Sequence, residues 1–392
     1  MYYQYAYDEL GQLIREDNKD ANKSYTYTYD SRGNILEKKT YAFTLGTLGT
    51  AQKTDSYGYA TDSWKDRLTS YNGQTITYDS IGNPLTYNNG SAYTFTWEGR
   101  QMQTATKGNT TWTYTYNADG LRTGKSNGSA VYTYTWNENR QLQSMTWNYG
   151  YAIFSYDANG MPYSVKNYDA ILDVERTYLY VTNLQGDVLS IIDASSGATA
   201  VTYTYDAWGR LIGKDGTSSD YASIYEYNPL TYRGYIYDSE TGFYYLQSRY
   251  YDPTIGRFLN ADDTAFLGAS GTAIGWNLFA YCENNPINKV DYFGSLSFWK
   301  RAYYLAHGVF LITTGLLAII SSIRKGFVVA ALGSFTANVI AGLVGTALGL
   351  MPLGQYWGTI IAVTTIITLL WHIKVLLYNI PAGLNEIKKA LS

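Results

Sequence analysis

A short repeated unit runs through residues 5–211 and constrains the fold more than any other feature of the sequence. The unit has an aromatic or apolar residue, a spacer, an aromatic residue, then Asp or Asn, and Gly three positions later. Its clearest copies are residues 5–13, 27–35, 76–82 and 203–211. Between the last two copies, an acidic residue or Asn recurs at positions 79, 98, 117, 137 and 157, in steps of 19 or 20. So regular a step predicts one β-hairpin per unit.

Each unit also predicts its own local structure. Segments such as YTYTYD at 25–30 and VYTYTW at 131–136 alternate with period 2, which places aromatic rings on one face of a strand and Thr on the other. The Asp-x-x-Gly step forms the turn, because the short polar side chain can bond local amides and Gly supplies a positive φ. A lone hairpin is only marginally stable in water, so we expect the hairpins to pair edge to edge into one long antiparallel ribbon.

The aromatic residues allow two interpretations. The chain has 43 Tyr, 10 Trp and 12 Phe with a charged fraction of 16%, which favours a mainly β body. In the first interpretation the rings are cross-strand contacts within the ribbon. In the second, the repeats resemble cell-wall-binding modules of about 20 residues per unit, in which aromatic rings stack on sugars or cage cations. A cell-surface carbohydrate is therefore one predicted partner.

Residues 232–294 carry a different set of motifs: GFYYL at 242–246, RYYDP at 249–253, GRF at 256–258, and NPIN at 285–288 followed by Asp291 and Gly294. In this order they resemble the core-associated region that ends the shell of RHS/YD-repeat proteins, a bacterial polymorphic-toxin family related to the C subunits of toxin complexes. The resemblance implies a hollow shell around a C-terminal cargo, with a variable, usually toxic, domain directly after the core. Family shells are considerably longer than 294 residues, so we expect this piece to line part of a shell without closing one.

The resemblance also implies candidate residues for self-cleavage. Some family members cut themselves with an aspartyl-protease-like site just after a closing Asp-Pro-x-Gly-Leu motif, where two nearby carboxylates could share a proton. The corresponding acids are Asp262 or Asp263, together with Asp291. The closing motif here is DYFGS at 291–295, with Tyr in place of the Pro and Ser in place of the Leu. In the alternative interpretation the acids bond local backbone amides, and Arg257 pairs with one of them.

Several other kinds of chemistry are not indicated. The single cysteine, Cys282, excludes an intramolecular disulfide and a multi-Cys zinc site. Both histidines, His307 and His372, follow residue 294, so the body before them offers no His triad or His metal site. No Walker-type loop is present. We therefore predict neither a cofactor nor a metal.

The charge is divided unevenly along the chain. Seven Lys or Arg residues and one acidic residue follow Gly294, so this segment carries +6 and the body before it −9, which gives the net charge of −3. Affinity for nucleic acid comes mainly from neutralising phosphates, and an acidic body is a poor surface for that purpose. Nucleic acid is therefore not a predicted partner.

Residues 295–392 have an apolar composition. The runs 303–323, 326–351 and 357–373 contain no charged residue. Crossing about 30 Å of hydrocarbon takes roughly 20 residues of helix, so we predict about three membrane spans and a lipid bilayer as the partner of residues 303–378. A buried helical hairpin in a soluble fold is the alternative. The middle run has small residues at every fourth position, a pattern that lets membrane helices pack closely: Gly333, Ala337, Ala341, Gly345 and Gly349.

The sequence thus predicts a mainly β fold, with YD repeats over 1–231, a core-associated region over 232–294 and an α-helical membrane-type domain over 295–392. The predicted function is that of a polymorphic-toxin fragment whose last domain inserts into a target membrane, with a cognate immunity protein as a further partner. The alternative is a membrane-anchored surface protein that is structural or binds carbohydrate. We expect the protein to be membrane-associated and exported or cell-surface in origin, although no signal peptide begins this chain.

Overall fold

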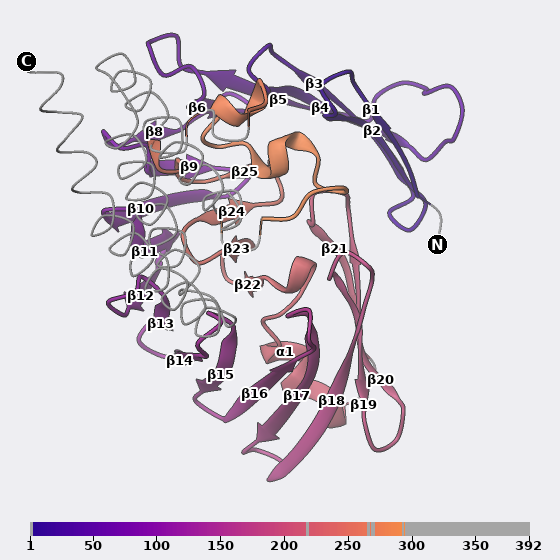
Figure 1. Ribbon diagram of the computed structural model, residues 1–392, viewed down its shortest axis with the longest axis vertical. Coiled ribbons are helices and arrows are strands. Elements are labelled where there is room, and N and C mark those ends of the chain that lie inside the picture. The colour runs from indigo at the N-terminus through magenta and orange to yellow at the C-terminus, as the bar shows by residue number, and fades with distance from the viewer. Residues whose placement is uncertain (1–2, 217–218, 265–266, 268–270, 292–293, 295–392) are drawn as a thin grey trace, which may run out of the picture. The chain divides into compact units, whose positions relative to one another are not determined.

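The computed structural model describes residues 3–216, 219–264, 267, 271–291 and 294, which belong to one compact unit, residues 1–297. Three antiparallel sheets make up this unit (Figure 1). The first has seven strands: β1 (Tyr3–Tyr7), β2 (Leu13–Asn18), β3 (Lys23–Tyr29), β4 (Ile35–Ala42), β5 (Lys53–Tyr59), β6 (Leu68–Tyr71) and β7 (Gln74–Thr75). Neighbours in the sheet are also neighbours in sequence, so the strands form a continuous ribbon of hairpins.

The ribbon continues in a sheet of fourteen strands, again in sequence order. They are β8 (Thr77–Tyr78), β9 (Pro84–Asn88), β10 (Ala92–Glu98), β11 (Gln101–Lys107), β12 (Thr110–Tyr116), β13 (Arg122–Ser126), β14 (Val131–Trp136), β15 (Leu142–Trp147), β16 (Gly150–Tyr156), β17 (Pro162–Asp169), β18 (Val174–Thr182), β19 (Val188–Asp193), β20 (Thr199–Tyr205) and β21 (Leu211–Asp215). A third sheet has four short strands: β22 (Ile236–Asp238), β23 (Phe243–Tyr245), β24 (Tyr250–Asp252) and β25 (Arg257–Phe258).

The turn of each repeat has the predicted chemistry. At the first turn, Asp8 Oδ1 accepts hydrogen bonds from the backbone N of Leu10 at 3.0 Å and of Gln12 at 2.8 Å. Gly11 has a φ of +77°, and the strand register shifts by one residue just before the turn. The same pair of hydrogen bonds forms at Asp30, Asp79, Asn117, Asn137, Asp157, Asn183 and Asp206. The prediction of one hairpin per unit is confirmed by these turns.

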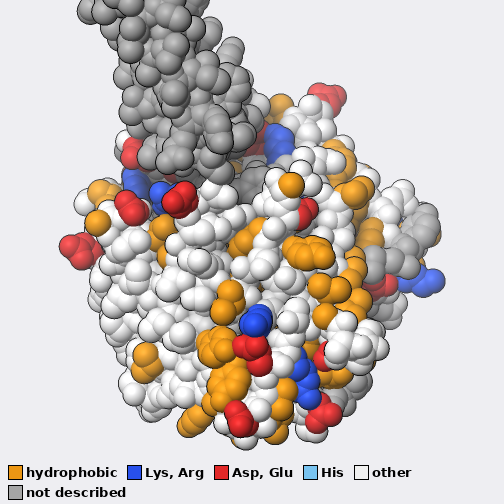
Figure 2. Space-filling view, turned by 60° about the horizontal axis from the view of Figure 1, so that its bottom comes forward, with side chains coloured by type: hydrophobic (Ala, Val, Ile, Leu, Met, Phe, Trp, Pro, Cys, Tyr) orange, Lys and Arg blue, Asp and Glu red, His pale blue; other side chains and the backbone are white. Residues whose placement is uncertain are grey.

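The two faces of the ribbon differ as the alternation predicts. On β12 and β14, Tyr114 and Tyr134 are buried, while the intervening threonines are exposed. Thr133 bonds Thr146 across the strands at 2.5 Å. Some apolar side chains also reach the outer face on β16–β18, including Ile153, Tyr163 and Leu179, and Figure 2 shows apolar side chains gathered in bands on one face.

A further contact joins each repeat to the one before it. The aromatic residue directly before the turn donates a hydrogen bond to the carbonyl that follows the preceding turn. Tyr156 Oη thus donates to the Leu142 carbonyl at 2.9 Å, and Trp136 Nε1 donates to the Arg122 carbonyl at 2.7 Å. The same bond is made by Tyr59, Trp97, Tyr116 and Tyr205. The second aromatic residue of the unit is therefore a polar connector as well as a core side chain.

The interior of the ribbon is filled by residues 232–291, which we call the core segment. Its sheet, β22–β25, lies between the strands of the ribbon in Figure 1. All residues of β23, β24 and β25 are buried, and Tyr244 and Tyr251 have no exposed surface. The largest cluster of buried side chains contains residues from both the repeats and the core segment, so the two share one core.

The beginning and the end of the ribbon meet. Asn18 Nδ2 on β2 donates to the Tyr205 carbonyl at 3.2 Å, and the backbone N of Ala207 donates to Glu16 Oε1 at 2.9 Å. The Tyr27 ring lies 5.7 Å from that of Trp208. We expected this piece to line part of a shell without closing one. In the structure, however, the first hairpins pack directly on the last repeat turn, so the two ends of the ribbon are in contact.

Helix is scarce in the described residues, which contain a single six-residue α-helix, α1 (Ala222–Tyr227), and 3₁₀ helices at Ser219–Tyr221, Tyr232–Gly234, Ile274–Trp276 and Tyr281–Asn284. None of these described helices is long and apolar enough to cross a membrane, which takes roughly 20 residues. The predicted fold class is therefore wrong in its α-helical membrane-type part. Hydropathy shows which residues avoid water, and it does not by itself determine a helical backbone. Residues 295–392 lie outside the described residues, and with them the predicted packing positions Gly333, Ala337, Ala341, Gly345 and Gly349.

Candidate functional site at the end of the core segment

Buried charged residues attach the core segment to the ribbon. Arg122 on β13 donates to both carboxylate oxygens of Asp238 at 2.6 and 2.8 Å, and Lys125 Nζ bonds Asp238 at 3.0 Å and Glu240 at 2.8 Å. Burial would raise the pKa of Asp238, but the two cations hold it below the ordinary value. The Arg122 guanidinium also lies 4.5–5.9 Å from the centroids of four rings: Tyr114, Tyr134, Tyr245 and Tyr250.

Arg257 of the GRF motif makes a similar attachment farther along. Its guanidinium donates to Asn34 Oδ1 and Tyr59 Oη, both at 3.2 Å, and to the Asp66 carbonyl at 2.7 Å. These partners lie on β5 and in two loops of the first sheet, between β3 and β4 and between β5 and β6. The sequence interpretation that paired Arg257 with Asp262 or Asp291 is therefore wrong, and another arginine takes that place.

That arginine is Arg249, the first residue of the RYYDP motif. Its Nη2 lies 3.2 Å from Asp262 Oδ2 and 3.3 Å from Asp291 Oδ2, so one nitrogen bridges the two carboxylates. Its Nη1 donates to the Leu278 carbonyl at 2.9 Å, and its Nε donates to the Gly294 carbonyl. The guanidinium is 95% buried and lies over the Phe258 ring, which is part of the same core.

Two of the three candidate acids thus come together. Asp262 and Asp291 share Arg249, while Asp263 is exposed and its backbone N donates to Asp262 Oδ1 at 2.8 Å. The backbone N of Asp291 donates to Tyr235 Oη at 3.2 Å. Sequence reasoning named the two acids but not their shared partner.

Gly294 is the last described residue of the chain. Its carbonyl accepts two hydrogen bonds, one from Arg249 and one from Ser248 Oγ at 2.7 Å. Its φ is +66°, and a Cβ at this position would lie 2.6 Å from the Leu246 carbonyl oxygen. The backbone therefore passes too close to residues 246–249 for any side chain, which explains why the closing motif has Gly here.

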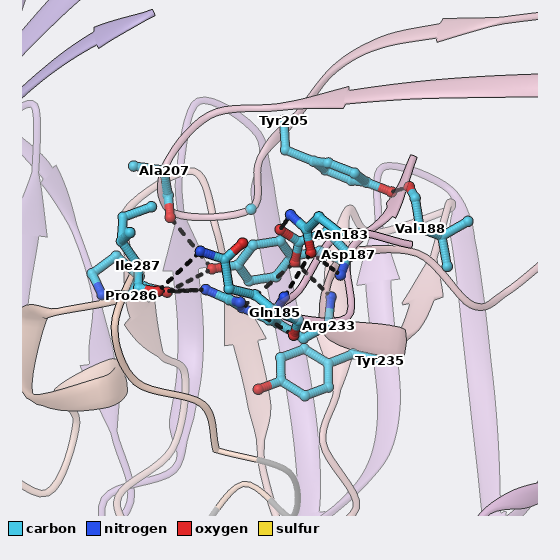
Figure 3. A network of polar contacts seen from close by, with 12 residues as sticks. Asn183, Gln185, Asp187, Val188, Tyr205, Ala207, Arg233, Tyr235, Pro286 and Ile287 are labelled. Carbon is cyan, nitrogen blue, oxygen red and sulfur yellow. Dashed lines mark hydrogen bonds and ion pairs between the residues drawn. The ribbon is translucent and has the colours of Figure 1, made fainter. Parts of the chain in front are cut away.

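The NPIN motif is fixed by a third arginine, Arg233 (Figure 3). Its Nη2 donates to the Pro286 carbonyl and, at 3.5 Å, to the Ile287 carbonyl, and its Nη1 donates to the Gln185 carbonyl at 3.2 Å. Its backbone N donates to Asp187 Oδ1 at 3.0 Å, with a φ of 56° that few residues other than Gly adopt. The last motif before the exit is thereby bound to the turn between β18 and β19.

The junction thus contains two carboxylates bridged by Arg249, next to a carbonyl oxygen that accepts two hydrogen bonds. The guanidinium offsets the repulsion between the two carboxylates, which lets them stay close together. The hydrogen bonds polarise the Gly294 carbonyl, one residue before the predicted cut. Cleavage at this junction stays a prediction. In the part of the chain that the structure describes, the junction included, no group of three or more His, Cys, Asp or Glu side chains is placed to hold a metal ion.

One sequence signal could have pointed to Arg249. A charged residue flanked by Tyr-rich strand residues has to be buried with the strand, and buried charges need a partner. Arg249, directly before Tyr250 and Tyr251, fits this description. Its partner Asp291 lies 42 positions away, so the pattern shows that a partner exists without showing which one.

Comparisons with known proteins agree with this architecture. The family model of the teneurin YD-shell matches residues 1–287. The tRNA3(Ser)-specific nuclease WapA of Bacillus spizizenii is 32% identical over 301 residues, which cover 73% of this chain and 11% of the relative. The double-stranded DNA deaminase toxin A of Burkholderia cenocepacia is 25% identical over 321 residues, which cover 74% of this chain and 20% of the relative.

A solved structure supports the fold at lower identity. The TcdB2-TccC3-Cdc42 crystal structure superposes with a TM-score of 0.58 at 19% identity, covering 76% of this chain and 16% of that chain. This likeness concerns the fold alone. The chain spans only 11% and 20% of the two curated relatives described above, so their activities do not follow from these matches.

Proposed function

Because the chain belongs to the teneurin YD-shell family, we propose that it is part of an RHS-type polymorphic toxin, in which residues 1–294 end a shell and the segment after Gly294 is the toxic cargo. Relatives named as a nuclease and as a deaminase toxin support the toxin assignment. Export from the producing cell and a cognate immunity protein are parts of the same proposal.

The observation that carries the proposal is the junction at Gly294. The core segment fills the ribbon, and Arg249 and Ser248 hold the Gly294 carbonyl at the point of exit. Composition changes at the same point, since the segment before it carries −9 and the segment after it +6. A fixed exit followed by a chemically different segment fits a scaffold that presents a cargo.

The mode of action is the finer part of the proposal. The uncharged runs 303–323 and 326–351 favour action at a lipid bilayer over an enzymatic cargo. The tail also has few of the His, Asp, Glu and Cys residues from which nuclease and deaminase sites are built.

The test compares the full chain with a chain that ends at Gly294, each expressed in bacteria from an inducible promoter with and without a secretion signal. Growth and membrane potential are followed together. We expect arrest with rapid depolarisation from the full chain and normal growth from the shorter one. Growth arrest without depolarisation would support the toxin proposal but reject the bilayer as its target. Normal growth in every arm would overturn the toxin proposal.

A carbohydrate-binding function is the second candidate. The inward-facing rings, such as Tyr114 and Tyr178, are at least 98% buried and cannot stack on a sugar from outside. Tyr151 and Tyr168 on the outer face of β16 and β17 lie 5.2 Å apart, and their hydroxyls bond Glu175 and Asp173. Retention of the chain by purified cell walls, and its loss in Tyr151→Ala, would support this function.

A further inference from the structure

A buried amine and a buried carboxyl group meet where the ends of the ribbon join, and a second buried carboxyl group, that of Glu16, lies near them. Lys38 on β4 and Asp206 in the turn after β20 are separated by 168 positions in sequence, yet Nζ lies 3.5 Å from Asp206 Oδ2. Their side chains are 6% and 0% exposed. Glu16 on β2 is fully buried, and its Oε1 accepts the backbone N of Ala207, the residue directly after Asp206.

Aromatic rings enclose this group. Lys38 Nζ lies 5.0 Å from the centroid of the Tyr25 ring and 5.7 Å from that of Tyr27. Tyr27 also packs on Trp208. Water is thus kept away from the amine, and an enclosed site without water favours condensation of an amine with a carboxyl group over hydrolysis of the product.

The charged neighbours of Lys38 are Asp206, Glu16, Arg210 and Asp55. Burial lowers the pKa of the Lys38 ammonium against the attraction of Asp206 and Glu16. Burial and the nearby Asp206 raise the pKa of Glu16. Asp55 lies opposite Lys38 on β5, but its carboxylate forms an ion pair with Lys53 and accepts a hydrogen bond from Asn72. The surroundings therefore shift Lys38 towards the neutral amine and Glu16 towards the protonated acid.

We propose that Lys38 and Asp206 condense after folding into an intramolecular amide, an isopeptide bond, with Glu16 as the residue that transfers the protons. The cross-link is a modification of the chain itself and does not depend on the proposed toxin function. It would join the first hairpins covalently to the last repeat turn.

The turn around Asp206 is suited to the reaction. Its Oδ1 accepts two backbone N–H groups, from Trp208 at 3.1 Å and Arg210 at 2.9 Å. Two such donors stabilise the negative charge that develops on a carboxyl oxygen when a nucleophile adds to the carbon. Its Oδ2, the oxygen that would leave, faces Lys38 Nζ and also accepts Arg210 Nε at 3.1 Å.

The atoms balance without any other reactant. One proton passes from the Lys38 ammonium to the Asp206 carboxylate, directly or through Glu16, and leaves an amine and a carboxylic acid. The Nζ lone pair then forms a bond to Cγ, while the electrons of the C=O bond move to Oδ1. Glu16 carries a second proton from Nζ to Oδ2. The electrons on Oδ1 then re-form the C=O bond as the Cγ–Oδ2 bond breaks, and one water leaves.

A second buried pair in the chain serves as an internal control. Lys125 Nζ lies closer to its partner, 3.0 Å from Asp238 Oδ1. Arg122, however, bonds both oxygens of Asp238, whereas Arg210 bonds only Oδ2 of Asp206. The attraction of Asp238 and Glu240 outweighs burial and raises the pKa of Lys125, whereas the pKa of Lys38 is lowered. The ionised state is therefore favoured more strongly at Lys125 and Asp238 than at Lys38 and Asp206. Proximity alone therefore predicts a cross-link at Lys125, whereas the chemistry predicts one at Lys38.

The test is the intact mass of the purified full chain, with tandem mass spectrometry of its proteolytic peptides. We expect a mass lower than that of the sequence by one water, and a joined peptide pair containing Lys38 and Asp206. The full sequence mass in the folded wild-type protein would overturn the proposal, and so would a water loss that maps to any other pair, including Lys125 and Asp238.

Variants then identify the roles. Asp206→Asn should lose one ammonia in place of one water, since the same attack on an amide releases ammonia. Lys38→Arg and Glu16→Gln should keep their full sequence mass, and Asp238→Asn should still lose one water. A Glu16→Gln chain that cross-links as fast as the wild type would reject the role of Glu16 while leaving the bond itself in place.

Discussion

Arg122 donates two hydrogen bonds to Asp238, across 116 positions of sequence, and neither side chain reaches solvent. Replacing Arg122 by Met should therefore lower the free energy of unfolding by about 3–5 kcal/mol, because a buried carboxylate loses its main partner. Urea unfolding followed by tryptophan fluorescence measures the change.

A matched surface pair provides the control. Lys166 and Glu175 form an ion pair of 2.9 Å, but both side chains are more than one-third exposed. Lys166→Met should change the free energy of unfolding far less than Arg122→Met does, because solvent screens an exposed pair. Equal losses in the two variants would show that the core segment is not held by Arg122.

The pair of Arg122 and Asp238 also makes stability depend on pH. The pKa of Asp238 is lower in the folded chain than its ordinary value of 3.8, so its pairing stabilises the fold above that value and is lost as the pH falls through the folded value. The difference in urea midpoint between wild type and Asp238→Asn should thus be large near about pH 7 and shrink towards about pH 3. A difference that stays constant over this range would contradict the argument.

The thiol of Cys282 should report on unfolding. Burial, with a contribution from the negative charge of Asp291, raises its pKa, and the thiolate is the reactive form. An aromatic disulfide reagent at mildly alkaline pH should therefore label the native chain very slowly and the urea-unfolded chain at once. Because the chain has a single Cys, the signal needs no further assignment. Rapid labelling of the native chain would mean that residues 281–284 open readily.

Arg249 should fix the exit of the chain. Arg249→Met removes the bridge between Asp262 and Asp291 and one of the two hydrogen bonds to the Gly294 carbonyl. We expect a trace of added protease to cut this variant near residue 294 well before it cuts the wild type. Arg140→Met is the control, since Arg140 is an exposed turn residue that bonds Gln247. Identical cleavage patterns would show that Gly294 is held by other contacts.

Self-cleavage is tested in the same preparations without added protease. If the bridged acids cut the chain, the wild type should separate into a body and a tail, while Asp291→Asn and Asp262→Asn remain intact at 44.0 kDa. Asp263→Asn should behave like the wild type, because Asp263 is exposed. An intact wild-type chain would reject the prediction.

Local chemistry explains why the turns could be predicted. The Asp8 turn needs a short polar side chain and a residue that accepts positive φ, and both requirements lie within four positions. The turn also forms where the Gly is absent, since Arg140 stands at the Gly position of the Asn137 turn and adopts a φ of 60°. The side-chain alternation of the strands is equally local.

The site could be predicted only in part, because its contacts join distant positions. Asp262 and Asp291 were found through a motif, but choosing between Arg249 and Arg257 requires the register of β24 and β25, which tertiary packing sets. The meeting of Glu16 with Ala207 depends on the curvature accumulated over the whole ribbon. No pattern within one repeat of 19 or 20 residues contains that information.

The position of the core segment also sets an order of events during synthesis. The ribosome makes the repeats first, and the side chains that fill their concave face, such as Tyr244 and Tyr251, emerge only afterwards. Until then, Arg122 has no Asp238, and the inner rings of the repeats have little to cover them. Chains interrupted before residue 232 should therefore expose a broad aromatic face, which is what chaperones and proteases recognise. The fold thereby distinguishes finished from unfinished copies of itself.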